Sequence, residues 1–140
     1  MTISNKISGK IINYNSSFLG EILFDKNIIN INKSEKVNGE YYIIPGFVDL
    51  HCHGGGGFDT MDGVQAIKKM SSYHLSKGTT SLLATTWTSS FDHTFASLSG
   101  FNSLMNTNSN LLGVHLEGPF INAAKLGAQP ALTIKPSIQF

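Results

Sequence analysis

The feature that most constrains this fold is a regular alternation of strand-like and helix-like segments after Pro45. Strand candidates begin near Phe47, Thr79 and Leu111, so successive starts lie about 32 residues apart, the length of one β/α unit. Strands that alternate with helices pair in parallel, and both faces of such a sheet become buried. The sequence therefore predicts an α/β architecture for residues 45–140.

The number of these units limits what the sheet can be. A closed (β/α)8 barrel needs roughly 250 residues, whereas about 95 residues follow Pro45. Apolar residues at helical spacing predict helices from Val64 to Leu75 and from Phe91 to Met105, the second weakened by Gly100. We expect about the first three units of a TIM-type barrel, truncated, and a small open α/β domain is the alternative.

Residues 1–44 have a different pattern. Short β-prone segments alternate with turn residues such as Asp25-Lys26-Asn27, which predicts a small all-β unit. The segments are Ile3–Ile7, Lys10–Tyr14, Phe18–Phe24, Ile28–Ile31 and Tyr41–Ile44.

Composition excludes several classes of partner. Ten Lys+Arg oppose nine Asp+Glu, and no run of like charge occurs, so neither a nucleic-acid partner nor a membrane partner is indicated. No stretch approaches the roughly 18 apolar residues of a membrane span, and we expect no signal peptide. The single cysteine, Cys52, forms no internal disulfide, which favours a cytoplasmic protein.

Two histidines stand two residues apart on the first strand candidate of the α/β region, in the segment Pro45–Gly54. Because strand side chains alternate between faces, Asp49, His51 and His53 point the same way. Two imidazoles on one face can share a metal ion, although such a pair alone is a weak signal. Four glycines, Gly54–Gly57, follow and allow close approach of the backbone to an ion or substrate. Asp49 lies two strand steps below His53, so we expect it to support the site rather than bind the ion.

A carboxylate lies at the end of the third strand candidate, within the segment Gly113–Phe120. Burial of Glu117 there is costly unless a cation compensates its charge. The sequence therefore predicts a metal site formed by His51, His53 and Glu117. The alternative is that Glu117 caps a neighbouring loop or helix. His115 shares the face of Glu117 and is either a core histidine or a catalytic one.

These residues resemble those of a known family. Pro-Gly-Phe-x-Asp-x-His-x-His-Gly is similar to the first-strand motif of the amidohydrolase superfamily. Gly-Val-His-Leu-Glu-Gly-Pro-Phe is similar to the third-strand signature of N-acetylglucosamine-6-phosphate deacetylases, and Thr85–Ser89 looks like that family's second strand. By this resemblance, residues 1–44 are a small β-sandwich segment and residues 45–140 are a partial amidohydrolase barrel.

The resemblance implies a metal-dependent hydrolase that removes acetate from N-acetylglucosamine 6-phosphate in amino-sugar catabolism. It implies a divalent metal, zinc or iron, bound by Glu117 with His51 and His53, a small-molecule amino-sugar phosphate as partner, and a homo-oligomeric full-length form. Gln129 stands where some relatives have a substrate-contacting histidine, so it is a candidate for substrate binding or a plain loop residue. The catalytic aspartate of a late strand and two further histidines would lie beyond Phe140, and we expect the chain alone to be inactive.

Two other interpretations remain open. One is a different amidohydrolase, resembling dihydroorotase or hydantoinase, in which His51 and His53 matter and Glu117 does not. The other is a non-catalytic remnant that retains the motif residues. The full reading frame would separate them, by showing whether two more histidines and a late aspartate follow.

Overall fold

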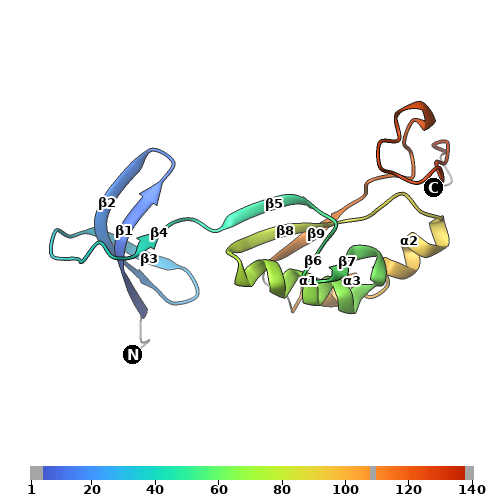
Figure 1. Cartoon of the computed structure of the whole chain (residues 1–140). Helices are drawn as coiled ribbons and strands as arrows, with labels where there is room; N and C mark the ends of the chain where they lie inside the picture. Colours follow the sequence, from blue (N-terminus) through green and yellow to red (C-terminus); the bar gives the residue numbers. More distant parts are fainter. Residues whose placement is uncertain (1–4, 108–109, 138–140) are drawn as a thin grey trace. The chain divides into compact units, whose positions relative to one another are not determined.

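The structure of the protein, a computed structural model, describes residues 5–107 and 110–137 (Figure 1). The chain divides into two compact units, Met1–Pro45 and Gly46–Phe140, and each is described by itself. Ile3, where the first β segment was predicted to begin, lies outside the described residues.

The first unit forms one four-stranded sheet with the strand order β3-β2-β1-β4. Strands β1 and β2 are antiparallel, and β4 pairs in parallel with β1. The two segments expected on either side of Gly9 form one strand, because Gly9 pairs directly with Gly20 and the ladder continues through it. The strands are β1 (Asn5–Asn13), β2 (Ser16–Phe24), β3 (Ile28–Lys33) and β4 (Tyr42–Ile43).

The second unit follows the predicted alternation of strands and helices. Its parallel sheet has the order β5-β8-β9, and these strands begin at Phe47, Thr79 and Leu111, as the sequence predicted. The elements are β5 (Phe47–Cys52), β6 (Gly54–Gly55), β7 (Phe58–Asp59), η1 (Thr60–Asp62), α1 (Val64–Ser76), β8 (Thr79–Thr85), α2 (Phe91–Leu98), α3 (Phe101–Met105), β9 (Leu111–His115) and η2 (Ala123–Lys125).

Helices α1 and α3 pack against one face of this sheet (Figure 1). Ile67 and Met70 lie three residues apart on α1 and are fully buried, as are Leu82 and Ala84 of β8. The alternation along β8 places these two side chains on the helix-covered face. The buried cluster is Cys52, Ile67, Met70, Leu82, Ala84, Phe101, Leu104 and Leu111. The helices thus cover one face, and the opposite face of β5 carries Asp49 and His51.

The second predicted helix is not continuous, so that prediction was wrong in its extent. Helix α2 ends at Leu98, and Gly100 adopts a left-handed conformation with φ of 83° before α3 begins. This change of direction allows Phe101 and Leu104 to enter the core. Glycine adopts this backbone conformation at little steric cost, which explains why the break falls there. Within residues 5–107 and 110–137, every helix is too short or too polar to span a lipid bilayer.

Candidate metal centre

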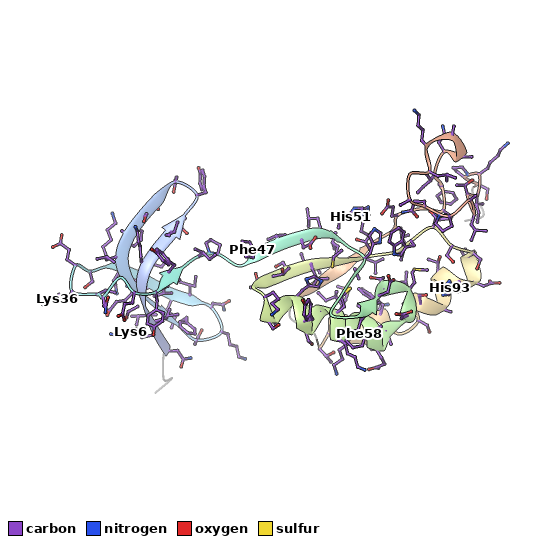
Figure 2. All side chains as sticks on the ribbon, viewed as in Figure 1. Lys6, Lys36, Phe47, His51, Phe58 and His93 are labelled. Carbon is purple, nitrogen blue, oxygen red and sulfur yellow. The ribbon has the colours of Figure 1, made fainter. Side chains whose placement is uncertain are left out.

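The end of strand β5 carries the two histidines, and its backbone is held from two directions. The His51 backbone N–H donates to Asp49 Oδ1 at 3.1 Å. The next N–H, that of Cys52, donates to the buried Thr85 Oγ1 of β8 at 2.8 Å. His53 follows directly after the strand (Figure 2, where His51 is labelled). Asp49 therefore supports the backbone of a histidine.

Glu117, two residues beyond the end of β9, reaches the same place. Its Oε2 atom lies 2.9 Å from His51 Nε2 and 3.0 Å from His53 Nε2. The two Nε2 atoms lie 3.1 Å apart. The structure therefore brings together the three side chains that the sequence selected, with their ligand-type atoms at the corners of one small triangle.

The dimensions of this triangle fit a divalent cation. Two ligands of a tetrahedral zinc ion with bonds of roughly 2.0–2.1 Å lie about 3.3 Å apart, and the observed separations are 2.9–3.1 Å. Glu117 Oε2 is buried and makes no hydrogen bond in the described part of the chain, despite its two close nitrogen neighbours. A cation between the three atoms would compensate that oxygen.

The triangle is open on one side. The side chain of His51 is 51% exposed, whereas those of His53 and Glu117 are 22% and 29% exposed. A catalytic metal site holds three protein ligands and keeps a further position for water or substrate. The exposure of His51 leaves access for such a ligand.

Trp87 is a further residue at this site that the sequence did not select. Its ring stacks on the imidazole of His53, with 4.1 Å between centroids and 24° between planes. Trp87 follows the end of β8. Only its place at the carboxyl end of a parallel strand could have indicated it, since sites in α/β proteins lie there.

His74 of α1 lies beneath the glycine segment that follows His53. Its Nε2 atom is 3.1 Å from Gly54 O and 3.2 Å from Cys52 Sγ. A Cβ atom at Gly55 would collide with that nitrogen, so a larger residue there would displace the imidazole of His74. Burial raises the pKa of the Cys52 thiol, and the charge of Asp49 adds to this effect. Cys52 belongs to the buried core of this unit.

Most of this chain is similar in sequence and in fold to known proteins. No family model matches the chain. The chain is 38% identical over 115 residues to the N-acetylglucosamine-6-phosphate deacetylase of Bacillus subtilis (strain 168), a match covering 76% of this chain. The crystal structure of N-acetylglucosamine-6-phosphate deacetylase from Thermotoga maritima superimposes with a TM-score of 0.85 at 33% identity over 96% of this chain. By sequence and fold, this chain is homologous to the N-terminal part of N-acetylglucosamine-6-phosphate deacetylases.

The chain spans only part of the length of these relatives. It spans 28% of the length of the Bacillus protein and 38% of the Thermotoga chain. A Mycobacterium smegmatis deacetylase variant, solved in complex with N-acetyl-D-glucosamine-6-phosphate, superimposes with a TM-score of 0.73 at 20% identity, covering 96% of this chain and 38% of that one. At that identity the likeness supports the fold alone.

Two other polar residues that the sequence singled out, His115 and Gln129, have defined surroundings in the deacetylase homologue. The His115 ring lies 4.7 Å from that of His51, and its Nδ1 atom is buried without a hydrogen-bond partner among the described residues. The Oε1 atom of Gln129 accepts a hydrogen bond from the Thr88 backbone N–H at 2.8 Å. Gln129 thus connects its loop to the segment after β8, and its amide NH2 group is the part suited to donate to a ligand.

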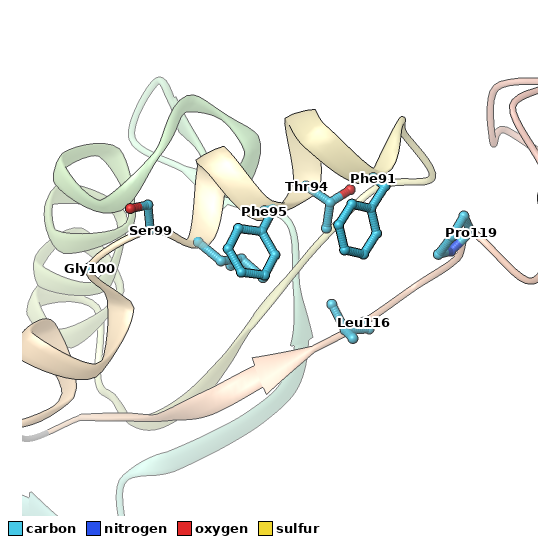
Figure 3. A pocket seen from close by; sticks show the side chains of 8 residues that line it. Phe91, Thr94, Phe95, Ser99, Gly100, Leu116 and Pro119 are labelled. Atoms are coloured by element: carbon cyan, nitrogen blue, oxygen red, sulfur yellow. The ribbon is translucent and has the colours of Figure 1, made fainter. Parts of the chain in front are cut away.

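A pocket of the deacetylase homologue lies elsewhere in this unit. It has a volume of about 600 Å³ and lies between α2 and the segment that follows β9. Figure 3 shows Phe91 and Phe95 facing Leu116 across it. Its lining is almost entirely apolar and includes neither the histidines nor Glu117, so we assign no chemistry to it.

Proposed function

We propose that this protein is a metal-dependent deacetylase of N-acetylglucosamine 6-phosphate that releases acetate and glucosamine 6-phosphate. The observation that carries the proposal is the convergence of His51 Nε2, His53 Nε2 and Glu117 Oε2 within 3.1 Å of one another. The homologous deacetylases support the choice of substrate. Since an amino-sugar phosphate is a small molecule, the proposed partner is neither a nucleic acid nor a membrane.

The three residues would hold one divalent ion, zinc or iron. When bound, such an ion lowers the pKa of a water molecule and polarises the carbonyl of the acetamide group. Glu117 supplies the negative charge, and the two imidazoles supply neutral nitrogen ligands. The hydrogen bonds to Asp49 and Thr85 keep the end of β5 in place, which fixes the spacing of the two histidines. Gln129 is proposed to donate an amide N–H to the substrate.

We further propose how the chain relates to a complete site. Residues 1–44 are assigned to a small β-sandwich segment, and residues 45–140 to the first units of a (β/α)8 barrel. The parallel order β5-β8-β9 and the likeness to the Thermotoga deacetylase support this assignment. The resemblance implies that a late aspartate and two further histidines take part in turnover, so we propose that the 140 residues alone are inactive. The single cysteine leaves no internal disulfide, which supports a cytoplasmic location.

An assay of acetate release tests the proposal. The full reading frame that contains these residues and the 140 residues alone are purified and supplied with zinc or iron and N-acetylglucosamine 6-phosphate. We expect turnover by the longer protein only. Glu117→Gln in the longer protein should lower kcat/KM by more than the roughly 10- to 100-fold loss that follows removal of a residue supporting a metal ligand.

Three results would each contradict a part of the proposal. Turnover of a dihydroorotate or hydantoin, but not of the amino-sugar phosphate, would assign the protein to a different branch of the amidohydrolases. No turnover of any of these substrates by the metal-loaded longer protein would favour a non-catalytic remnant. Rapid turnover by the 140 residues alone would refute the proposed need for later residues.

A further inference from the structure

The second ring nitrogen of His53 lacks the support that metal-binding histidines usually have. Such histidines almost always donate the other ring N–H to a carboxylate, a carbonyl oxygen or a water molecule, and this bond fixes the ring plane. The Nδ1 atom of His53 is buried and has no hydrogen-bond partner in residues 5–107 and 110–137. Because the terminal torsion of histidine is broad, the ring needs another restraint to aim Nε2 at a shared ion.

Trp87 is placed to supply that restraint. Its ring covers the face of His53 at 4.1 Å with 24° between the planes, so rotation of the imidazole would bring its edge into the indole. Offset stacking of aromatic rings is favourable beyond the apolar area that it buries. The contact limits rotation and uses neither ring nitrogen.

The backbone on both sides of Trp87 is itself held in place. The N–H of Thr86 donates to His115 O of β9 at 3.0 Å. The N–H of Thr88 donates to Gln129 Oε1 at 2.8 Å. Both threonines are almost fully buried, at 1% and 2% exposure. Trp87 therefore lies on a segment whose backbone is bonded to the strand before Glu117 and to the loop beyond it, which restrains the position from which its ring extends.

We propose that Trp87 is a positioning residue that orients His53 Nε2 toward the ion by stacking, in place of a hydrogen bond to Nδ1. This inference rests on the proposed metal site. It assigns to Trp87 a role beyond covering the site with apolar surface. A side chain that only fills space could be replaced by leucine, whereas a stacking partner requires an aromatic face.

Cobalt binding separates these two roles. The dissociation constant for Co²⁺ and its visible absorption spectrum are measured for the purified wild-type protein, Trp87→Phe and Trp87→Leu. We expect Trp87→Leu to raise the dissociation constant by about 10- to 100-fold, the usual effect of removing a residue that orients a ligand, and to change the absorption bands. Trp87→Phe should restore most of the affinity and the wild-type spectrum.

The wild-type protein provides a second readout. Trp87 is the single tryptophan of the sequence, so stoichiometric Co²⁺ should quench the tryptophan emission, and His53→Ala should abolish the quenching. This measurement remains decisive if Trp87→Leu fails to fold. Emission that is unchanged at full Co²⁺ occupancy would show that Trp87 does not contact a ligand, and would overturn the inference.

The controls distinguish failure of the inference from failure of the metal site. Phe95→Leu removes a different stacked aromatic, one that pairs with Phe91 on α2, and should leave Co²⁺ affinity unchanged. If His53→Ala and Glu117→Gln bind Co²⁺ like the wild type, the proposed metal site is wrong. If both lose binding while Trp87→Leu retains wild-type affinity and spectrum, only the role of Trp87 is wrong.

Discussion

Replacing Glu117 with glutamine removes the carboxylate that lies within 3.0 Å of both imidazoles and keeps the size of the side chain. Without metal, this change should cost little stability. The Oε2 atom makes no hydrogen bond in the described part of the chain, and a glutamine amide can donate to a neutral imidazole at the same place. The change should therefore act on metal binding and leave the metal-free fold intact.

The expected size of the effect follows from the linkage of binding to folding. A ligand at 100 times its dissociation constant stabilises the folded state by about 2.7 kcal/mol. If the loss of Glu117 weakens zinc binding about 100-fold, the same zinc concentration then contributes only about 0.4 kcal/mol. For a unit the size of residues 46–140, each kcal/mol corresponds to roughly 4–8 °C in Tm. Zinc should therefore raise Tm by about 10–20 °C in the wild type and by about 2–3 °C in the variant.

Calorimetric melting in EDTA and in zinc measures both quantities. Glu35→Gln is a matched control, because it makes the same chemical change at an exposed position in the first unit. It should leave the zinc shift unchanged. A wild-type zinc shift in Glu117→Gln would refute the reasoning, since it would show that the ion binds without this carboxylate.

Three further predictions concern the surroundings of the site. Gly55→Ala places a Cβ against His74 Nε2, so urea denaturation should show a loss of about 1–3 kcal/mol; an unchanged midpoint would contradict that contact. Leu82→Ala empties a fully buried core position and should cost about 2–5 kcal/mol in the same measurement, whereas the half-exposed Leu112 should tolerate alanine with a much smaller loss. Burial raises the pKa of the Cys52 thiol, so a disulfide reagent at mildly alkaline pH should modify it slowly in the native protein and rapidly in urea. The folded state keeps this proton at a pH where the unfolded chain releases it. The free energy of unfolding should therefore fall as the pH rises above the ordinary thiol pKa. A free energy of unfolding of the wild type that does not change over this pH range would contradict the prediction.

The secondary structure of the second unit could be predicted because its signals are local. The strands begin at Phe47, Thr79 and Leu111, as the spacing indicated. The break between α2 and α3 was underestimated, since apolar periodicity continues past Gly100. The direction in which the chain leaves that glycine depends on the core that Phe101 enters, and helical periodicity does not encode it.

The sequence by itself determined the chemistry that the site can offer. Strand alternation puts His51 and His53 on one face, and the position of Glu117 at a strand end follows from the β/α pitch; both are properties of a few neighbouring residues. The tertiary structure decided which atoms meet. The parallel pairing of β5 with β8 and of β8 with β9 brings Glu117 to the histidines and Trp87 onto His53. Contacts between residues this far apart in the chain depend on strand register and packed side-chain volumes, which exist only once the sheet has formed.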